Sequence, residues 1–217
     1  MRYRVSLMPA AYRNRPQYVL KPTSITVHNT ANPDATAANH EKYLNAQPRS
    51  ASWHITVDDI EAVLHIPLNE QAWHAGTHAG NTSSIGIEVC EFTNAKRAAA
   101  AEANCQTLIA AMLTGTAPAA FRAAHLGLDN VRTHMSWSGK YCPRVILPRW
   151  VQFIAGIKAI MEGGADVADR IIVVIAPAGS DRERAVLAEA ERQALRSYII
   201  DPAATRITRQ NPKGDPQ

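Results

Sequence analysis

The stretch from Thr133 to Pro143 reads T-H-M-S-W-S-G-K-Y-C-P and places His134 and Cys142 eight positions apart. Gly139 lies between them and can let the backbone turn back, because glycine readily adopts left-handed conformations. This spacing is typical of a strand end, a loop and a return of the chain to the same point. Imidazole nitrogen and thiolate sulfur are good Zn²⁺ ligands, and a catalytic zinc has three protein ligands with water in the fourth position. We therefore expect one further ligand from elsewhere in the chain.

His28 is the best candidate for that further ligand. It ends a short β-branched run, Ile25-Thr26-Val27, which predicts a buried strand. Alternation along the strand places Ile25 and Val27 on one face and Thr26 and His28 on the other. A histidine in this position is well placed at the rim of a sheet. From these residues alone, the alternative that His28 caps a turn is equally good.

A carboxylate interrupts a second apolar strand, which the sequence predicts over residues 84–92. Ile85, Ile87 and Val89 point to one layer, whereas Glu88 points to the other. Burial of an unpaired carboxylate is costly, so Glu88 needs a partner or a function. A salt bridge to a neighbouring arginine is the structural alternative.

A set of motifs occurs in a fixed order along the chain: V-H-N-T, S-W-H-I-T-V-D-D, A-W-H-A-G, I-G-I-E-V-C and T-H-x-x-W-S-G-K-x-C-P. In this order they resemble the zinc-dependent N-acetylmuramoyl-L-alanine amidases of type 2, which share a fold with the peptidoglycan recognition proteins. Phage endolysins and bacterial autolysins are the most similar members. The resemblance covers residues 15 to 160 approximately. It implies an α/β fold with a mixed central β-sheet flanked by helices.

The resemblance also implies roles for particular residues. One catalytic Zn²⁺ would be held by His28, His134 and Cys142. Glu88 would transfer the proton from water to the leaving amine, and Lys140 would stabilise the tetrahedral oxyanion. The residues expected to contact substrate are Asn29, His54, Trp73, His74 and Thr133. For His54, a packed strand histidine is the alternative.

This chain departs from the family pattern at Trp53. Some members have a tyrosine with a catalytic role at this position. The indole of Trp53 cannot take over that role, because it has no acidic proton of useful pKa. The proton transfer would then depend on Glu88.

Bulk properties narrow the function classes. The formal net charge is +4, with a pI of about 9.1, and residues 163–217 hold eight basic and eight acidic residues. The whole excess therefore lies in residues 1–162, which suits a polyanionic surface such as bacterial peptidoglycan. Nucleic acid is the competing partner, but no basic helix or Lys/Arg cluster supports it.

The N-terminus lacks the apolar core of a signal peptide, and no apolar run is long enough to span a membrane. We expect a protein made in the cytoplasm, without membrane insertion, that reaches the wall after holin-type release or lysis. The three cysteines do not form a disulfide framework. We expect Cys90 and Cys105 to be small core residues.

The patterning predicts an irregular segment over residues 1–23, a helix from 33 to 44 and a hairpin of residues 52–58 and 62–68. The adjacent aspartates 58 and 59 are assigned to its turn rather than to catalysis. A loop over 69–84, in which His78 is a surface residue, precedes the strand over 84–92. Helices follow over 95–114, 118–125 and 149–161, with a strand over 130–134 between the last two.

The composition changes after residue 162, which predicts a catalytic domain over 1–162 and a small β-α-β unit over 165–217. Strands are expected at 171–175 and 198–200, a helix at 181–196 and disorder at 202–217. Such a small unit cannot bury a core alone. It would bind the wall, form a homo-oligomer or dock as a bare structural extension.

Alternative functions remain at this point. The leading interpretation is a wall-lytic zinc amidase acting on peptidoglycan. A cytoplasmic amidase that recycles soluble muropeptides would use the same chemistry. A peptidoglycan-binding module without catalysis is a third interpretation, which the presence of Glu88 and Lys140 disfavours.

Overall fold

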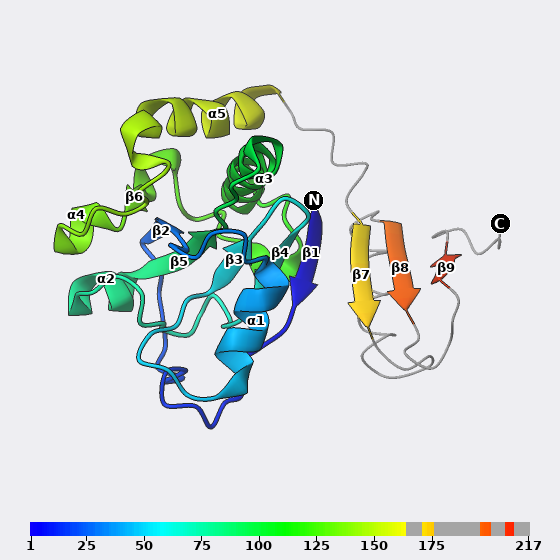
Figure 1. Ribbon diagram of the computed structural model, residues 1–217, viewed down its shortest axis with the longest axis horizontal. Coiled ribbons are helices and arrows are strands. Elements are labelled where there is room, and N and C mark those ends of the chain that lie inside the picture. Colours follow the sequence, from blue (N-terminus) through cyan, green and yellow to red (C-terminus); the bar gives the residue numbers. More distant parts are fainter. Residues whose placement is uncertain (164–170, 176–195, 201–206, 211–217) are drawn as a thin grey trace. The chain divides into compact units, whose positions relative to one another are not determined.

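The structure is a computed structural model that describes residues 1–163, 171–175, 196–200 and 207–210 (Figure 1). The chain divides into two compact units. One comprises Val5–Ala165, and the other comprises Met1–Arg4 with Asp166–Gln217.

The larger unit is built on a mixed sheet with the strand order β6-β2-β5-β3-β4. Its strands are β2 (Ser24–Asn29), β3 (Ile55–Val57), β4 (Glu61–Leu64), β5 (Ser84–Val89) and β6 (Val131–Thr133). β2 pairs in parallel with both β5 and β6, and β3 pairs in parallel with β5. Only the β3–β4 hairpin within this sheet is antiparallel. The parallel strands therefore bring their carboxyl ends to one edge, where binding sites of open α/β sheets usually form.

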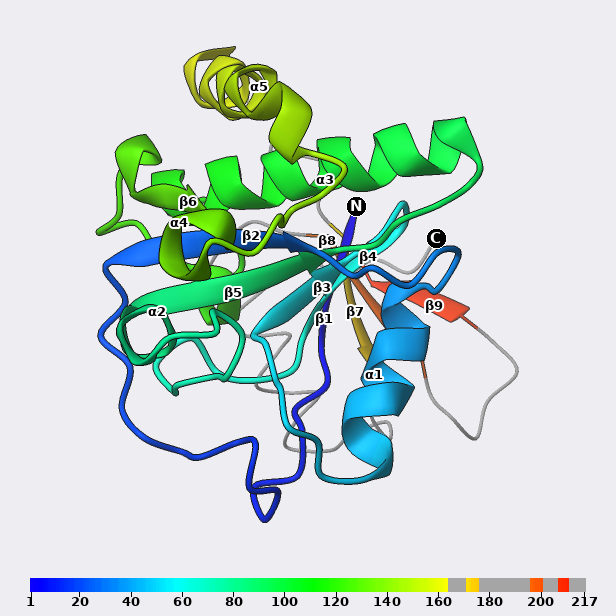
Figure 2. The ribbon, with the colours of Figure 1, turned by 60° about the vertical axis from the view of Figure 1, so that its left-hand side comes forward.

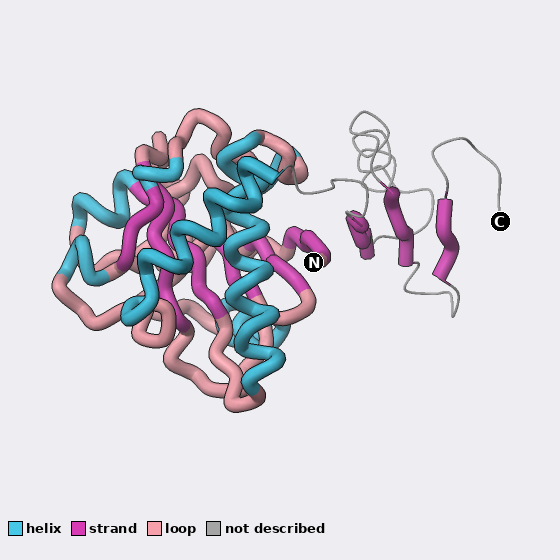
Figure 3. The backbone as a smooth tube through the Cα atoms, turned by 90° about the horizontal axis from the view of Figure 1, so that it is seen from above, coloured by secondary structure: helices cyan, strands magenta, loops and turns pink. Residues whose placement is uncertain are grey.

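Helices cover both faces of this sheet (Figures 2 and 3). They are α1 (Ala37–Ala46), α2 (His78–Ser83), α3 (Ala95–Thr114), α4 (Met135–Ser138) and α5 (Trp150–Gly163), with 3₁₀ turns at Ala119–Phe121, Leu128–Asn130 and Leu147–Arg149. α3 packs on one face and is covered in turn by α5, while α1 lies on the other face against β3 and β4. Central strands covered on both sides are buried throughout, as β2 is.

The long helix α3 has the bounds that the sequence predicts. The Asn94 side chain caps its first turn by accepting from the backbone of Lys96 and Arg97, and Gly115 ends it in the left-handed conformation at φ 72°. Leu108 is among its fully buried residues, as expected for the stripe that faces the core.

Other elements differ from the expectation in detail. The first helix begins at Ala37 rather than near residue 33, because Thr36 and Asn39 form a capping box. The segment 69–84 is not a loop throughout, since α2 occupies its end. The stretch 118–125 contains only a short 3₁₀ turn.

The hairpin is confirmed, although its strands are shorter than expected. Its turn is held by the Asp58 carboxylate, which accepts from the backbone of Ile60 and Glu61. Cys90 and Cys105 are buried and free, as expected for core residues.

The second unit contains all but the last residue of β1 (Arg2–Val5), together with β7 (Ile171–Ile175), β8 (Arg196–Ile200) and β9 (Ile207–Gln210). β7 pairs in parallel with β1 and β8, and β9 pairs antiparallel with β8. The expectation of an irregular N-terminus was wrong for β1, and the expectation of disorder was wrong for β9. β1 gains its partner β7 from a distant part of the sequence, which local patterning cannot show, whereas β9 pairs with the nearby strand β8. The helix expected over 181–196 lies outside the described residues except for its last residue, Arg196, which begins β8.

Within the described part of the chain, no helix has the length and apolar character needed to cross a membrane.

Candidate metal centre and active site

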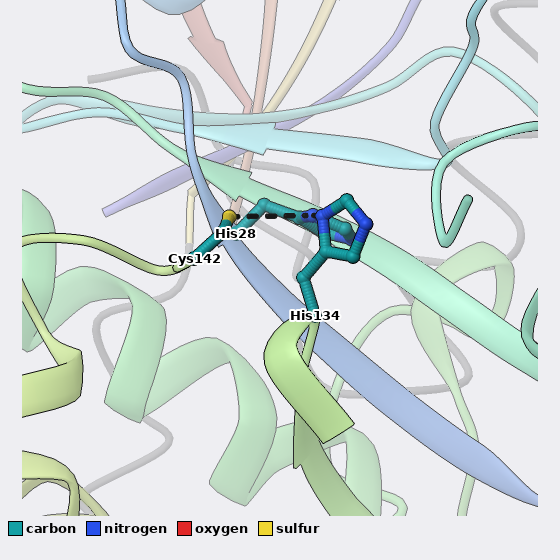
Figure 4. Close-up of side chains that lie close together, drawn as sticks. All are labelled: His28, His134 and Cys142. Carbon is teal, nitrogen blue, oxygen red and sulfur yellow. Dashed lines mark hydrogen bonds between the residues drawn. The ribbon is translucent and has the colours of Figure 1, made fainter. Parts of the chain in front are cut away.

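Three side chains of the types that bind metal ions meet at the carboxyl edge of the sheet. His28 is the second-last residue of β2, His134 directly follows the neighbouring β6, and Cys142 lies on the loop beyond it. Their ligand atoms all lie within 4.8 Å of one another. The two Nδ1 atoms are 3.0 Å apart, and Cys142 Sγ lies 3.7 Å from His28 Nδ1 (Figure 4). The structure thus brings together the ligand set expected from the sequence.

The loop between His134 and Cys142 is a closed turn. α4 follows His134 directly and ends at Gly139, which adopts φ 75°. The Met135 backbone N–H then donates to the Cys142 carbonyl at 2.9 Å. This contact confirms the expectation of a strand end, a loop and a return to the same point.

The protonation of these side chains suits a bound cation. Burial lowers the pKa of His28 well below its ordinary value, and also that of His134, so both rings are neutral and can offer a lone pair. Burial raises the pKa of the Cys142 thiol to about 11. The thiolate therefore needs a nearby positive charge at neutral pH, and a metal ion would supply it. Two imidazoles and one thiolate fit an ion that accepts nitrogen and sulfur donors.

Glu88 lies beside this cluster on the same face of the sheet. It is opposite His28 in the β2–β5 register and opposite Thr56 in the β3–β5 register. Its Oε2 atom is buried and has no hydrogen-bond partner. Burial raises the pKa of Glu88 to about 8, although the Lys140 charge opposes this rise. A carboxylate with a free oxygen and a pKa in this range is suited to proton transfer.

Lys140 is exposed on the loop, two residues before Cys142. Its positive charge acts on several groups of the site and lowers the pKa of Glu88, His28 and His134. The Lys140 ammonium group therefore lies at the exposed rim of the site, close enough to influence charge that develops there.

The comparisons with known proteins agree with this geometry. Residues 18–145 match the family model of N-acetylmuramoyl-L-alanine amidase. The chain belongs to this family. It is 46% identical over 155 residues to the amidase XlyA of Bacillus subtilis, a match that covers 69% of this chain and 49% of XlyA. It is 40% identical to the B. subtilis amidase CwlH, over 70% of this chain and 59% of CwlH.

The solved catalytic domain of XlyA superimposes with a TM-score of 0.65 at 43% identity, covering 72% of this chain and 99% of that domain. This likeness confirms the expected type 2 amidase fold, a mixed sheet flanked by helices. The chain spans about half the length of the curated relatives it matches.

Most of the residues expected to contact substrate in this amidase fold are engaged by the protein itself. Asn29 Oδ1 accepts from the backbone of Val145 and Ile146 and so clamps the segment beyond Cys142. Thr133 Oγ1 accepts from the Ser136 backbone N–H at the start of α4. Both contacts hold the ligand loop in place.

The two histidines of the same set are also buried and bonded. His54 accepts from the Gly86 backbone N–H at Nδ1, and its Nε2 lies 2.8 Å from the Glu70 carbonyl. These bonds favour the packed strand histidine. His74 Nδ1 lies 2.9 Å from His28 Nε2, and His74 Nε2 lies 3.2 Å from the Ser84 carbonyl. Trp73, by contrast, is half-buried.

Some side chains that hold the backbone around the site were not predicted from the sequence. The Arg144 guanidinium pairs with the Glu91 carboxylate, which also accepts from the Ala31 backbone. The Asn81 side chain holds the backbone of His74 and Ala75. The sequence around these residues gives no local signal for such contacts. Glu91 lies in E-F-T, Arg144 in P-R-V and Asn81 in G-N-T-S, and only the fold brings them to their partners.

Proposed function

We propose that this chain hydrolyses the amide bond between the lactyl group of N-acetylmuramic acid and L-alanine in peptidoglycan. The observation that carries the proposal is the cluster of His28, His134 and Cys142 with the unpaired Glu88 carboxylate beside it. Family membership supplies the chemical class. We further propose Zn²⁺ as the resident ion. Zinc held by such donors activates water and polarises a carbonyl for attack.

Glu88 would transfer the proton from the attacking water to the leaving amine. Ionised, its free Oε2 accepts a proton from the attacking water, and the resulting acid returns that proton to the leaving amine. The pKa of about 8 lies close to neutral pH, so both directions of transfer are accessible. A cation bound at the neighbouring ligands would favour the ionised form that begins the cycle.

Lys140 would stabilise the negative charge that develops on the carbonyl oxygen. Its place on the exposed side of the loop allows the side chain to reach a bound substrate without displacing a buried contact. Trp73 is the residue of the expected substrate-contacting set that is only half-buried, whereas the others are buried. Asn29, Thr133 and His54 instead use their side chains to bond the protein backbone, as described above, and we propose that they hold the site in shape rather than contact substrate.

The wall itself is the proposed partner, because the positive charge excess suits a polyanionic surface. We propose that residues 1–162 form the catalytic domain, and that residues 165–217 bind the wall or mediate self-association. The protein would act on the wall after holin-type release or lysis.

Product analysis on purified peptidoglycan, with and without a chelator, tests the proposal. We expect new L-alanine amino termini and no new reducing sugar ends, with all cleavage abolished by chelation and restored by added zinc. Cleavage that persists in a metal-stripped sample would refute the zinc mechanism. Absence of cleavage with zinc bound would refute the wall substrate, and soluble muropeptide monomers would then distinguish a recycling amidase from a binding module.

A further inference from the structure

We propose that the segment Trp73–Gly76, together with α2, orients both histidine ligands for the metal, and that His74 is a positioning residue rather than a substrate contact. The proposal rests on the proposed metal centre but not on the substrate. The segment sits directly behind the ligands: the His74 ring contacts His28, and a backbone hydrogen bond joins His134 to Ala75. One short segment thus supports two candidate ligands that lie far apart in the sequence.

A chain of hydrogen bonds fixes which nitrogen of His28 carries its proton. The Ser84 carbonyl can only accept, so His74 Nε2 must donate to it. The neutral His74 ring then has a lone pair at Nδ1, which requires His28 to donate from Nε2. The remaining lone pair of His28 is therefore at Nδ1, the atom that faces His134 and Cys142. The ring is held in the tautomer that a metal needs.

The His74 ring is itself held in place. It is buried, and its ring nitrogens lie 2.9 Å from His28 Nε2 and 3.2 Å from the Ser84 carbonyl. His54 lies beside it with ring centroids 5.8 Å apart, and its own bonds to the Gly86 and Glu70 backbone keep it fixed.

The backbone of the segment is held by α2. Asn81 Oδ1 accepts from the N–H of His74 at 2.9 Å and from that of Ala75 at 2.8 Å. A single side chain thereby sets both the His74 ring and the Ala75 carbonyl. The carbonyl accepts from His134, which leaves the other ring nitrogen of His134 for the metal.

A glycine provides the space for the ring. A Cβ atom added to Gly86 would lie 2.6 to 2.8 Å from atoms of the His74 imidazole, closer than van der Waals contact allows. Gly86 therefore has a packing role in the middle of β5. Any side chain at this position would displace His74 from the bond to His28.

The test compares the zinc affinity of the full chain with that of four variants, measured by competition with a chromophoric chelator in the absence of substrate. His74→Leu removes the acceptor and the donor. His74→Asn places an amide oxygen near the position of Nδ1 and can still accept from His28. His78→Leu is the matched control, because His78 is an exposed histidine of α2.

Loss of an outer hydrogen bond to a metal ligand typically weakens metal affinity about 10- to 100-fold. We expect that loss for His74→Leu, substantial recovery for His74→Asn and no change for His78→Leu. The visible spectrum of the cobalt-substituted protein should change for His74→Leu and return toward that of the unmodified protein for His74→Asn. Gly86→Ala should weaken zinc binding in the same direction.

Zinc binding by His74→Leu as tight as in the unmodified chain would overturn the proposal. So would equal weakening by Leu and Asn with an unchanged cobalt spectrum, since a general packing defect predicts that pattern. An unmodified chain that binds zinc but cleaves no amide would refute the proposed function alone and leave this comparison intact.

Discussion

Replacing Glu88 by glutamine in the metal-free protein should change how the free energy of unfolding depends on pH. Burial raises the pKa of Glu88 from its ordinary 4.5 to about 8. An acid with a raised folded pKa contributes stability that is fully present below its unfolded pKa and lost as pH rises through its folded pKa. Ionised Glu88 therefore destabilises the native state, and the neutral amide of glutamine avoids this effect.

The magnitude follows from the two pKa values. At about 1.36 kcal/mol per pKa unit, the step from 4.5 to about 8 corresponds to about 5 kcal/mol at most. Most of this loss develops above pH 5, so the stability advantage of Glu88→Gln should grow by about 4 kcal/mol between pH 5 and pH 9. Between pH 5 and pH 7 the growth should be about 2 to 3 kcal/mol.

Urea unfolding at pH 5, 7 and 9 in the presence of a chelator measures this difference. The chelator is required because a bound cation would stabilise the carboxylate and lower its pKa. Circular dichroism of both metal-free proteins provides the control that each is folded at all three pH values. Parallel pH profiles for the two proteins would show that Glu88 titrates near its ordinary value, and the reasoning from its buried, unbonded Oε2 would be refuted.

Three further changes test other parts of the molecule. Cys142→Ser should lose zinc, by direct metal analysis, together with amide cleavage, while circular dichroism stays unchanged; retained stoichiometric zinc would exclude the thiolate as a ligand. Lys140→Met should lower kcat about 10²- to 10³-fold with zinc content unchanged, as expected for loss of one oxyanion-stabilising group, and an unaltered kcat would remove Lys140 from the mechanism. Asn94→Ala removes the side chain that accepts at the start of α3 and should lower the free energy of unfolding by about 1 kcal/mol, whereas unchanged urea midpoints would show that the cap contributes little.

Local sequence patterns were sufficient to predict those elements whose capping, periodicity and turn residues lie within the element itself. α3 could be predicted to its end residues because an asparagine cap, an alanine-rich stripe and a terminal glycine all act within the helix. The strand that carries His28 and the turn at Gly139 were predictable for the same reason. The ligand set was then found by combining these local patterns with the ordered motifs.

The pairing of distant segments was beyond the reach of such patterns. β1 is a strand because of a partner far away in sequence, β7, and α2 was hidden in a segment rich in glycine and small polar residues. His54 and Asn29 were expected to face substrate, whereas the fold provides backbone partners for both. A side chain's hydrogen-bond partners depend on which strands become neighbours, and that arrangement is not encoded at any single position.

The sequence by itself determined the ligand types, the carboxylate within an apolar strand and the loop that brings Cys142 back to His134, because each is a property of residues close along the chain. Only the tertiary structure decided which nitrogen of His28 faces the metal site. That choice depends on the Ser84 carbonyl, the His74 ring and the free space over Gly86, which come together when β2, β5 and the segment before α2 pack around the same point.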